Sequence, residues 1–159
     1  LDSHETKVQY EPFNLNELAH DVVQKFNLSA QERQISIQID HNQHLPFANA
    51  DIAMIERVIE NLLDNALRYG GGQPVEVGCR CDAAGACISV LDRGPGIPDA
   101  EREAVFQPFY RLEGSRSRST GGSGLGLAIA RQLCSAHGWN IDLLAREGGG
   151  TEARVCLPL

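Results

Sequence analysis

The sequence lacks the features of several common protein classes. No apolar run approaches the length of a membrane-spanning helix, and no secretory signal peptide opens the chain. Basic residues are in deficit, because 14 Lys and Arg stand against 21 Asp and Glu, for a net charge of −7. A nucleic-acid surface needs a basic face that neutralises phosphates. We therefore expect no nucleic-acid partner and no membrane contact by this stretch of chain.

The cysteines show neither the even count of a disulfide framework nor the spacing of a zinc site. There are five of them: Cys79, Cys81, Cys87, Cys134 and Cys156. Cys79 and Cys81 form a C-x-C in a strand-like segment, but no histidine or second cysteine pair lies close by in the sequence. We therefore expect buried or half-buried free thiols in a reducing cytosol.

Two common phosphate-binding motifs are also missing. No G-x-x-x-x-G-K-[ST] occurs, and the glycine-rich stretch 121–126 (GGSGLG) does not follow a strand, as a dinucleotide fingerprint requires. The stretch instead runs into a helical pattern over 125–136, although each ordered glycine costs about 0.5–1 kcal/mol relative to alanine. The free amides and positive dipole end of a helix favour an anion. The pattern predicts a phosphate at this helix start, with a plain flexible loop as the alternative.

Length and composition indicate one globular domain. At 159 residues, 42% apolar and 22% charged, the chain can bury about 70% of its unfolded surface. Helical periodicity predicts helices at 15–29, 52–69, 100–106 and 125–136, the first three after the capping residues Asn14, Asp51 and Asp99. Alternating patterns predict extended segments at 7–13, 35–40 and 45–50, and hairpins of 74–82 with 86–92 and 140–145 with 151–158. Helices interleaved with hairpins predict an α/β fold, a two-layer sandwich with a mixed sheet.

Two asparagines stand out in the predicted helix 52–69. Asn61 and Asn65 are four residues apart and share one face, with Arg68 on the same side. Asparagine is a mediocre helix former, so a pair in a helix interior suggests a specific role. Neutral amide oxygens suit Mg²⁺ whose charge is already balanced by phosphates. A solvated polar face is the alternative.

The segment LDRGPGIP (91–98) places a carboxylate at the end of an apolar strand. Asp92 is followed by Gly94 and Gly96, which leave the backbone beside it open. A carboxylate in such a place could accept a hydrogen bond from an exocyclic amine. A simple strand-ending turn is the alternative.

The segment FQPFYR (106–111) brings three aromatic residues ahead of a polar, low-complexity stretch, 111–124. That stretch adds local positive charge through Arg111, Arg116 and Arg118. A mobile segment with arginine and glycine suits a lid over a nucleotide. An ordinary surface loop is the alternative.

Taken in this order, the segments resemble the ATP-binding catalytic domain of bacterial sensor histidine kinases, which has the GHKL or Bergerat fold. The five similar segments are NLLDNALRYG (61–70, N box), DRGPGIP (92–98, G1 box), FQPFYR (106–111, F box), GGSGLGLAIARQL (121–133, G2 box) and GGGTEARVCLP (148–158, G3 box). The likeness spans about residues 8–158. It implies a mixed sheet of about five strands with three main helices on one face. It also implies that 8–159 form the ATP-binding domain and 1–7 the end of a linker.

The resemblance implies a set of ATP-binding residues. They are Asn61, Asn65, Arg68, Tyr69, Asp92, Gly94, Gly96, Ile97, Phe109, Arg111, Arg116, Arg118, Gly122, Ser123, Gly124, Leu125, Gly126, Leu127 and Thr151. Asn61 and Asn65 would meet Mg²⁺ and phosphate, with Asn65 the more direct metal ligand. Asp92 would accept a hydrogen bond from the adenine amino group. The three arginines are alternative candidates for contact with the γ-phosphate.

The implied activity needs a second domain. In this family the domain binds Mg·ATP and donates the γ-phosphate to a histidine on a separate dimerisation domain, for relay to a response regulator. We therefore expect no nucleophile in this chain. His4, in Ser3-His4-Glu5, imitates the acceptor motif, but the residues that follow look extended and not helical. We expect a cytoplasmic location, within a full-length protein that is membrane-anchored.

Two other functions stay open. The same nucleotide fold occurs in serine kinases and ATPase modules, but FQPFYR and the compact spacing favour the histidine kinase. A non-catalytic nucleotide-sensing domain is the second alternative, and the intact boxes speak against it.

Overall fold

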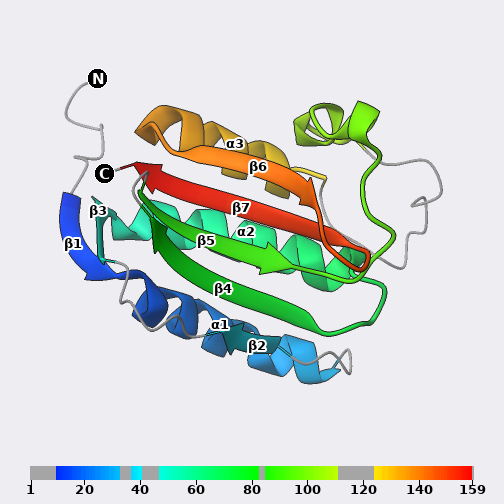
Figure 1. Cartoon of the computed structure of the whole chain (residues 1–159), viewed down its shortest axis with the longest axis horizontal. Coiled ribbons are helices and arrows are strands. Elements are labelled where there is room, and N and C mark those ends of the chain that lie inside the picture. Colours follow the sequence, from blue (N-terminus) through cyan, green and yellow to red (C-terminus); the bar gives the residue numbers. More distant parts are fainter. Residues whose placement is uncertain (1–9, 33–36, 41–46, 83–84, 111–123, 159) are drawn as a thin grey trace.

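The structure, a computed structural model, describes residues 10–32, 37–40, 47–82, 85–110 and 124–158 (Figure 1). The strands are β1 (Tyr10–Asn14), β2 (Ile37–Asp40), β3 (Phe47–Asp51), β4 (Val75–Asp82), β5 (Gly85–Leu91), β6 (Asn140–Ala145) and β7 (Thr151–Pro158). The helices are α1 (Leu15–Glu32), α2 (Ile52–Tyr69), α3 (Gly126–His137) and the short 3-10 helices η2 (Asp99–Glu101) and η3 (Ala104–Phe106). Helix 52–69 and hairpin 140–145 with 151–158 have the predicted bounds.

Five strands form one mixed sheet in the order β2-β4-β5-β7-β6. β2 runs parallel to β4, and the other neighbours are antiparallel. β1 and β3 pair separately as a two-stranded antiparallel sheet. The predicted hairpins are therefore β4–β5 and β6–β7, and the predicted mixed sheet is confirmed.

The helices lie against one face of the large sheet, which makes the two-layer sandwich (Figure 1). Helix α2 lies at the centre and buries seven side chains: Ile55, Val58, Ile59, Leu62, Leu63, Ala66 and Leu67. The sheet meets it with rows of facing residues such as Cys79, Ile88 and Val155, which belong to three adjacent strands. Because Leu62 is fully enclosed, its truncation to alanine is expected to cost about 2–5 kcal/mol.

Side-chain caps start the first two helices as predicted. Asn14 Oδ1 accepts from the amides of Asn16 and Glu17 at 2.8 and 3.2 Å. Asp51 Oδ1 accepts from the Met54 amide at 3.4 Å. At the end of α3, Gly138 is left-handed, with φ 74°, as the pair His137-Gly138 predicts.

The predicted helix 100–106 is wrong. The segment forms two 3-10 turns, and the Asp99 side chain caps neither of them. Asp99 instead pairs with Arg102 at 2.6 Å. Seven residues are too few for a stable α-helix without strong packing, and the packing here comes from Val105 and Phe106 at the end of the segment.

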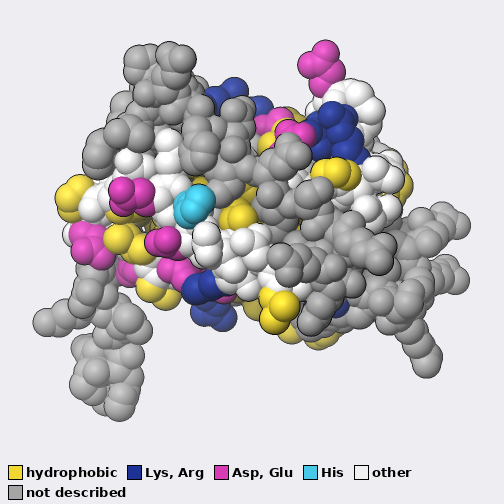
Figure 2. All heavy atoms as spheres, turned by 90° about the horizontal axis from the view of Figure 1, so that it is seen from below, with side chains coloured by type: hydrophobic (Ala, Val, Ile, Leu, Met, Phe, Trp, Pro, Cys, Tyr) yellow, Lys and Arg dark blue, Asp and Glu magenta, His cyan; other side chains and the backbone are white. Residues whose placement is uncertain are grey.

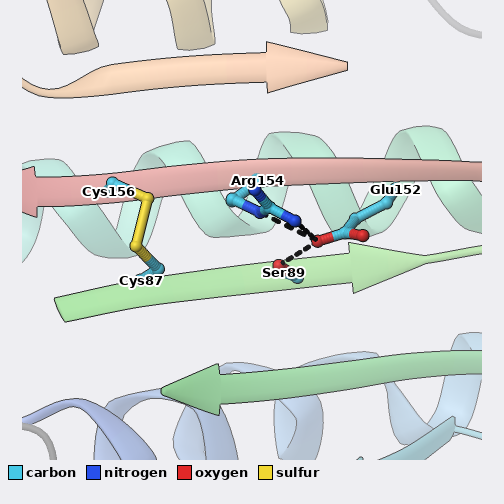
Figure 3. Close-up of a disulfide and its surroundings, with 5 residues drawn as sticks. All are labelled: Cys87, Ser89, Glu152, Arg154 and Cys156. Atoms are coloured by element: carbon cyan, nitrogen blue, oxygen red, sulfur yellow. Dashed lines mark hydrogen bonds and ion pairs between the residues drawn. A yellow bond between two sulfur atoms is a disulfide. The ribbon is translucent and has the colours of Figure 1, made fainter. Parts of the chain in front are cut away.

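The expectation of free thiols is wrong for two cysteines. Cys87 on β5 and Cys156 on β7 are joined in a disulfide across the sheet (Figure 3). They are facing partners in the strand register, with their Cα atoms 4.1 Å apart. An odd cysteine count could not reveal this pairing, because it depends on which strands become neighbours. Cys79 and Cys134 are free and buried, as expected.

Charges of both signs cover the surface. On the face seen from below in Figure 2, acidic and basic side chains are intermixed over the described residues. Lys25 of α1 pairs with Glu56 and Glu60 of α2 and so ties two helices together. None of the helices in the described part of the chain combines the length and apolar character of a membrane span.

Candidate nucleotide-binding site

The paired asparagines lie on a partly exposed side of α2, and Asn61 lies beside the start of α3. Asn61 and Asn65 are both partly exposed, one helical turn apart. A side-chain carbon built on Gly126 would lie 3.8 Å from Asn61 Oδ1 and 3.9 Å from the Asn61 carbonyl oxygen. The first residue of α3 therefore packs directly against Asn61. A glycine there leaves the asparagine amide accessible from the helix start.

Among the described residues, no side chain caps the start of helix α3. Leu125 stands at the cap position with φ −109° and ψ −14° and makes no capping hydrogen bond through its side chain. The first-turn amides of a helix have no intrahelical partners. The start of α3 therefore offers backbone donors and a positive dipole end to an anion, next to Asn61.

The aromatic residue Phe109 is hydrogen-bonded to Gly124, which lies just before α3. The Phe109 amide donates to the Gly124 carbonyl oxygen at 2.8 Å. A side chain on Gly124, whose φ is 75°, would approach Phe109 Cα to 3.0 Å. Phe109 itself has a positive φ of 64° and is 68% exposed. A left-handed phenylalanine is rare and marks a conformation that the surroundings impose.

Asp92 follows β5 and is buried, with 8% of its surface exposed. Its Oδ1 accepts from the Gly94 amide at 2.9 Å and from the Thr151 amide at 3.2 Å. Burial raises the pKa of this carboxyl, while the two backbone donors and the Arg146 charge act in the opposite direction. The site thus holds one oriented, poorly hydrated carboxylate.

Three glycines surround Asp92, each for a steric reason. A side chain on Gly70 would meet the Ala66 carbonyl at 2.4 Å, and one on Gly94 would meet the Tyr69 carbonyl at 2.3 Å. A side chain on Gly150 would meet the Asp92 carbonyl at 2.0 Å. The resemblance implies that Gly94 belongs to the ATP-binding set, and the structure adds that the packing of its loop against the end of α2 also requires a glycine there.

Arg146 was not singled out from the sequence, yet it binds the backbone of Asp92. It is 9% exposed, donates to the Asp92 carbonyl oxygen at 3.2 Å and pairs with Glu76 at 2.8 Å. Arg93 binds the turn between β6 and β7, because its guanidinium donates to the carbonyl oxygens of Glu147 and Gly149 at 2.7 and 3.1 Å. No local pattern reports these roles, because they depend on the β6–β7 turn folding onto the residues after β5.

Helix α2 separates the two ends of the site. Asn61 lies beside the start of α3, and Gly70, directly after the helix, lies beside Asp92. Nine residues at 1.5 Å each place these ends about 13 Å apart. The arrangement suits an elongated ligand with a hydrogen-bond donor at one end and negative charge at the other.

Other predicted residues have mixed placements. Arg68 pairs with Asp64 one turn earlier on α2, with Nε 2.9 Å from Oδ2, so its charge is already compensated. Tyr69 lies at the end of α2, where its carbonyl contacts Gly94. Gly96 has a φ of 79°, and Ile97 and Leu127 pack against the core. Five predicted residues lie outside the described part of the chain: Arg111, Arg116, Arg118, Gly122 and Ser123.

An open pocket of about 530 Å³ lies on the other side of the Asp92 loop. Its lining residues are Gln73, Pro74, Glu76, Arg93, Gly94, Gly148 and Gly149. The pocket shares only Gly94 with the predicted ATP-binding residues, and neither asparagine lines the pocket. We therefore locate the candidate site by its polar groups and not by this hollow.

The donor set fits Mg²⁺ only together with phosphates. Among the residues that the structure describes, no cluster of three or more His, Cys, Asp or Glu could hold a metal ion. Asn61 and Asn65 supply neutral amide oxygens, and the carboxylate between them in sequence, Asp64, is paired with Arg68. Neutral donors suit an ion whose charge is balanced by its other ligands.

The fold defines a class: a two-layer α/β sandwich with a five-stranded mixed sheet and helices on one face (Figure 1). The sequence matches the family described as histidine kinase-, DNA gyrase B- and HSP90-like ATPase over residues 50–159. The chain belongs to this family of ATP-binding domains. The predicted resemblance and fold are thereby confirmed.

The relatives are sensor kinases. The chain is 35% identical over 154 residues to the sensor protein CutS of Streptomyces coelicolor, covering 96% of this chain and 37% of that protein. It resembles full-length ShkA in complex with AMPPNP, with a TM-score of 0.82, 26% identity, and coverage of 96% and 32%. It also resembles the histidine kinase ThkA in complex with the response regulator TrrA, with a TM-score of 0.79, 27% identity, and coverage of 99% and 44%. The chain thus spans well under half the length of the curated relatives it matches, from 11% to 40% among those with the strongest matches.

Proposed function

We propose that this domain is the ATP-binding catalytic part of a sensor histidine kinase. It would bind Mg·ATP and donate the γ-phosphate to a histidine on a separate dimerisation domain of the whole protein, for relay to a response regulator. The observation that carries the proposal is the placement of Asp92 and of the Asn61 face at the two ends of one stretch of α2. The names of the relatives, which are sensor proteins and histidine kinases, support it.

At the base end, Asp92 reads adenine. Both backbone donors among the described residues use Oδ1, so Oδ2 is the oxygen that accepts from the exocyclic amino group. Arg146 and the glycines around Asp92 hold the carboxylate in place. The poor hydration of the buried carboxylate strengthens this hydrogen bond relative to one in water.

At the phosphate end, the chain acts by positioning and charge balance. The first-turn amides of α3 donate to phosphate oxygens, and Asn61 and Asn65 present their amide groups beside them. Asn65 is the more direct metal ligand, and Mg²⁺, when bound, neutralises phosphate charge. Arg111, Arg116 and Arg118 are candidates for the γ-phosphate, on the part of the chain outside the described residues. No residue of the domain acts as a nucleophile.

The domain organisation follows from the same proposal. Residues 8–159 form the ATP-binding domain and 1–7 the end of a linker. The domain works on the cytoplasmic side of the membrane that anchors the whole protein. The support for this location is that the relatives are named as sensor proteins.

Calorimetric titration of the 159-residue chain with ADP, with and without Mg²⁺, tests the binding step. We expect binding that Mg²⁺ strengthens, and we expect Asn65→Ala to remove most of the Mg²⁺ effect. Asn140→Ala, at an exposed position that begins β6, is the matched control and should bind like the parent. No heat of binding under either condition would refute the proposal.

Labelled ATP tests the transfer step and separates the alternatives. The chain alone should acquire no label, and a dimerisation domain added in trans should acquire an acid-labile one. An acid-stable label on the protein would point to a serine kinase. Release of inorganic phosphate with no label on either protein domain would point to an ATPase module. Binding without any turnover would point to a nucleotide-sensing domain.

A further inference from the structure

Cys87 and Cys156 face each other across the two strands that lead to Asp92 and Thr151. Both lie on the sheet face opposite the helices, in line with Ser89, Glu152 and Arg154 (Figure 3). Cys87 is 4% exposed, whereas Cys156 is partly exposed. One sulfur of the pair is therefore more accessible than the other.

The sheet does not need the sulfur–sulfur bond to bring the cysteines together. β5 and β7 stay in register from Gly85 opposite Pro158 to Leu91 opposite Glu152, so the ladder continues on both sides of the cysteines. A hydrogen bond of 2.8 Å from Ser89 Oγ to Glu152 Oε2 joins the same strands further along. Facing positions of a regular antiparallel pair are close in either redox state. The dithiol and the disulfide are thus compatible with one fold.

We propose that Cys87 and Cys156 form a reversible thiol–disulfide site that exchanges with low-molecular-weight disulfides of the glutathione class. The more exposed Cys156 thiolate attacks one sulfur of the reagent, forms a mixed disulfide and releases one reagent thiolate. The Cys87 thiolate then attacks Cys156 Sγ, forms the protein disulfide and releases the second thiolate. The two protein thiols lose two electrons and two protons, and one reagent disulfide becomes two thiols.

The other described cysteines are unsuited to this chemistry. Cys79 and Cys134 are buried in the core and have no cysteine opposite them in the structure's described part. Burial raises the pKa of each thiol to about 12, so little reactive thiolate exists at neutral pH. They serve as internal controls for selectivity.

Oxidation cross-links the strand pair that ends in the Asp92–Thr151 contact. Asp92 follows Cys87 by five residues, about 17 Å along the strand, so the sulfurs do not touch a bound nucleotide. The bond instead restrains the separation of β5 from β7. We expect slower amide exchange at Thr151 and greater thermal stability in the oxidised form. The ADP dissociation constant should change by less than about threefold, because the hydrogen bonds of Asp92 involve neither sulfur.

The experiment equilibrates the folded 159-residue chain in buffers of reduced and oxidised glutathione at varied ratios. Acid quenching, unfolding and alkylation are followed by peptide mass spectrometry. We expect five alkylated thiols at the reducing end and three at the oxidising end, with Cys87 and Cys156 as the two that disappear. One reversible transition should connect the two forms, without a lasting glutathione adduct. Cys79→Ala should keep this transition, and Cys156→Ser should abolish it.

Two outcomes would overturn the proposal. A bond that excess reduced glutathione opens only after urea unfolds the chain would be a fixed structural disulfide. A pair that stays reduced at the oxidising end would not be a thiol–disulfide site. The oxidised form should also melt about 5–10 °C higher than the reduced form, since the bond closes a long loop in the unfolded chain. Equal melting temperatures would refute the restraint on β5 and β7.

Discussion

Asp92 and Thr151 hold each other through two backbone-centred hydrogen bonds. The Asp92 amide donates to the Thr151 carbonyl at 2.9 Å, and the Thr151 amide donates to Asp92 Oδ1 at 3.2 Å. Since Gly94 also donates to Oδ1, the other carboxylate oxygen receives neither of these backbone hydrogen bonds. The contact therefore fixes which oxygen of Asp92 is left for a base.

Asp92→Asn should weaken nucleotide binding without unfolding the domain. Asparagine keeps an acceptor for Gly94 and Thr151 but places an NH₂ group where Oδ2 was. The amide NH₂ of the variant and the adenine amino group would then face each other as two hydrogen-bond donors without an acceptor. Loss of a hydrogen bond to a charged group, worth about 1.5–3 kcal/mol, corresponds to a roughly 10- to 150-fold higher dissociation constant for ADP by calorimetry. Asp142→Asn, an equal charge change at an exposed site on β6, should bind normally.

Asp92→Asn should also change how the free energy of unfolding depends on pH. Burial raises the pKa of Asp92 in the folded state above the ordinary value of an aspartate, 3.8. The folded state is therefore penalised at pH values above the folded pKa, and the penalty vanishes below the unfolded one. Asp92→Asn should be at least as stable as the parent at pH 7 and lose that advantage as pH falls toward 3.8. Urea unfolding measures the difference, and a variant much less stable at pH 7 would contradict it.

Arg146→Met should act on nucleotide binding through Asp92. The variant removes the donor to the Asp92 carbonyl and a positive charge that lowers the pKa of its carboxyl. Because binding needs the ionised form, affinity falls as pH drops through this pKa, and in the variant the fall should begin at a higher pH. A series of ADP titrations between pH 4 and 8 measures it, with Arg154→Met, which breaks the pair with Glu152 on the outer sheet face, as control. An unchanged pH profile would leave Arg146 a packing role alone.

Gly150→Ala and Gly149→Ala separate backbone strain from steric conflict. Both glycines have a φ of 108°, but a side chain meets the Asp92 carbonyl at 2.0 Å only from Gly150, and nothing within 4 Å from Gly149. Gly149→Ala should cost about 1–2 kcal/mol of unfolding free energy from strain. Gly150→Ala should cost at least about 3 kcal/mol and weaken ADP binding as well. Equal losses would mean that the turn relaxes away from Asp92.

Phe109 offers a test of the left-handed position. Asparagine tolerates φ near 64°, whereas β-branched valine does not. Phe109→Asn should be nearly neutral, because the ring is 68% exposed, and Phe109→Val should cost about 1–3 kcal/mol. Urea unfolding compares the two. Any loss of ADP affinity common to both reports on the ring, and identical stabilities would exclude strain at this residue.

Local signals sufficed for much of the fold. The helix 52–69 was predictable to the residue because Asp51 caps it and its apolar stripe ends before the glycines that follow Tyr69. The hairpin of β6 and β7 was equally clear, since alternation on both sides brackets a glycine turn. Asp92 and the asparagines were identifiable because polar residues stood at places where the pattern alone gave no reason for them.

What the sequence could not supply were relationships between distant segments. The disulfide of Cys87 with Cys156 depends on β7 lying between β5 and β6, and the role of Arg146 on a turn folding over the end of β5. The helix expected at 100–106 failed because Asp99 pairs with Arg102 and the burial of Val105 and Phe106 outweighs local propensity.

The pairing of β1 with β3 links the first described strand to the start of α2. Tyr10 lies opposite Asp51, and Asp51 caps the helix that carries both asparagines. The two-stranded sheet therefore connects Tyr10 to the residue that caps α2, separately from the five-stranded sheet (Figure 1). The capping residue thus stands at the start of the one continuous helix that carries the two asparagines.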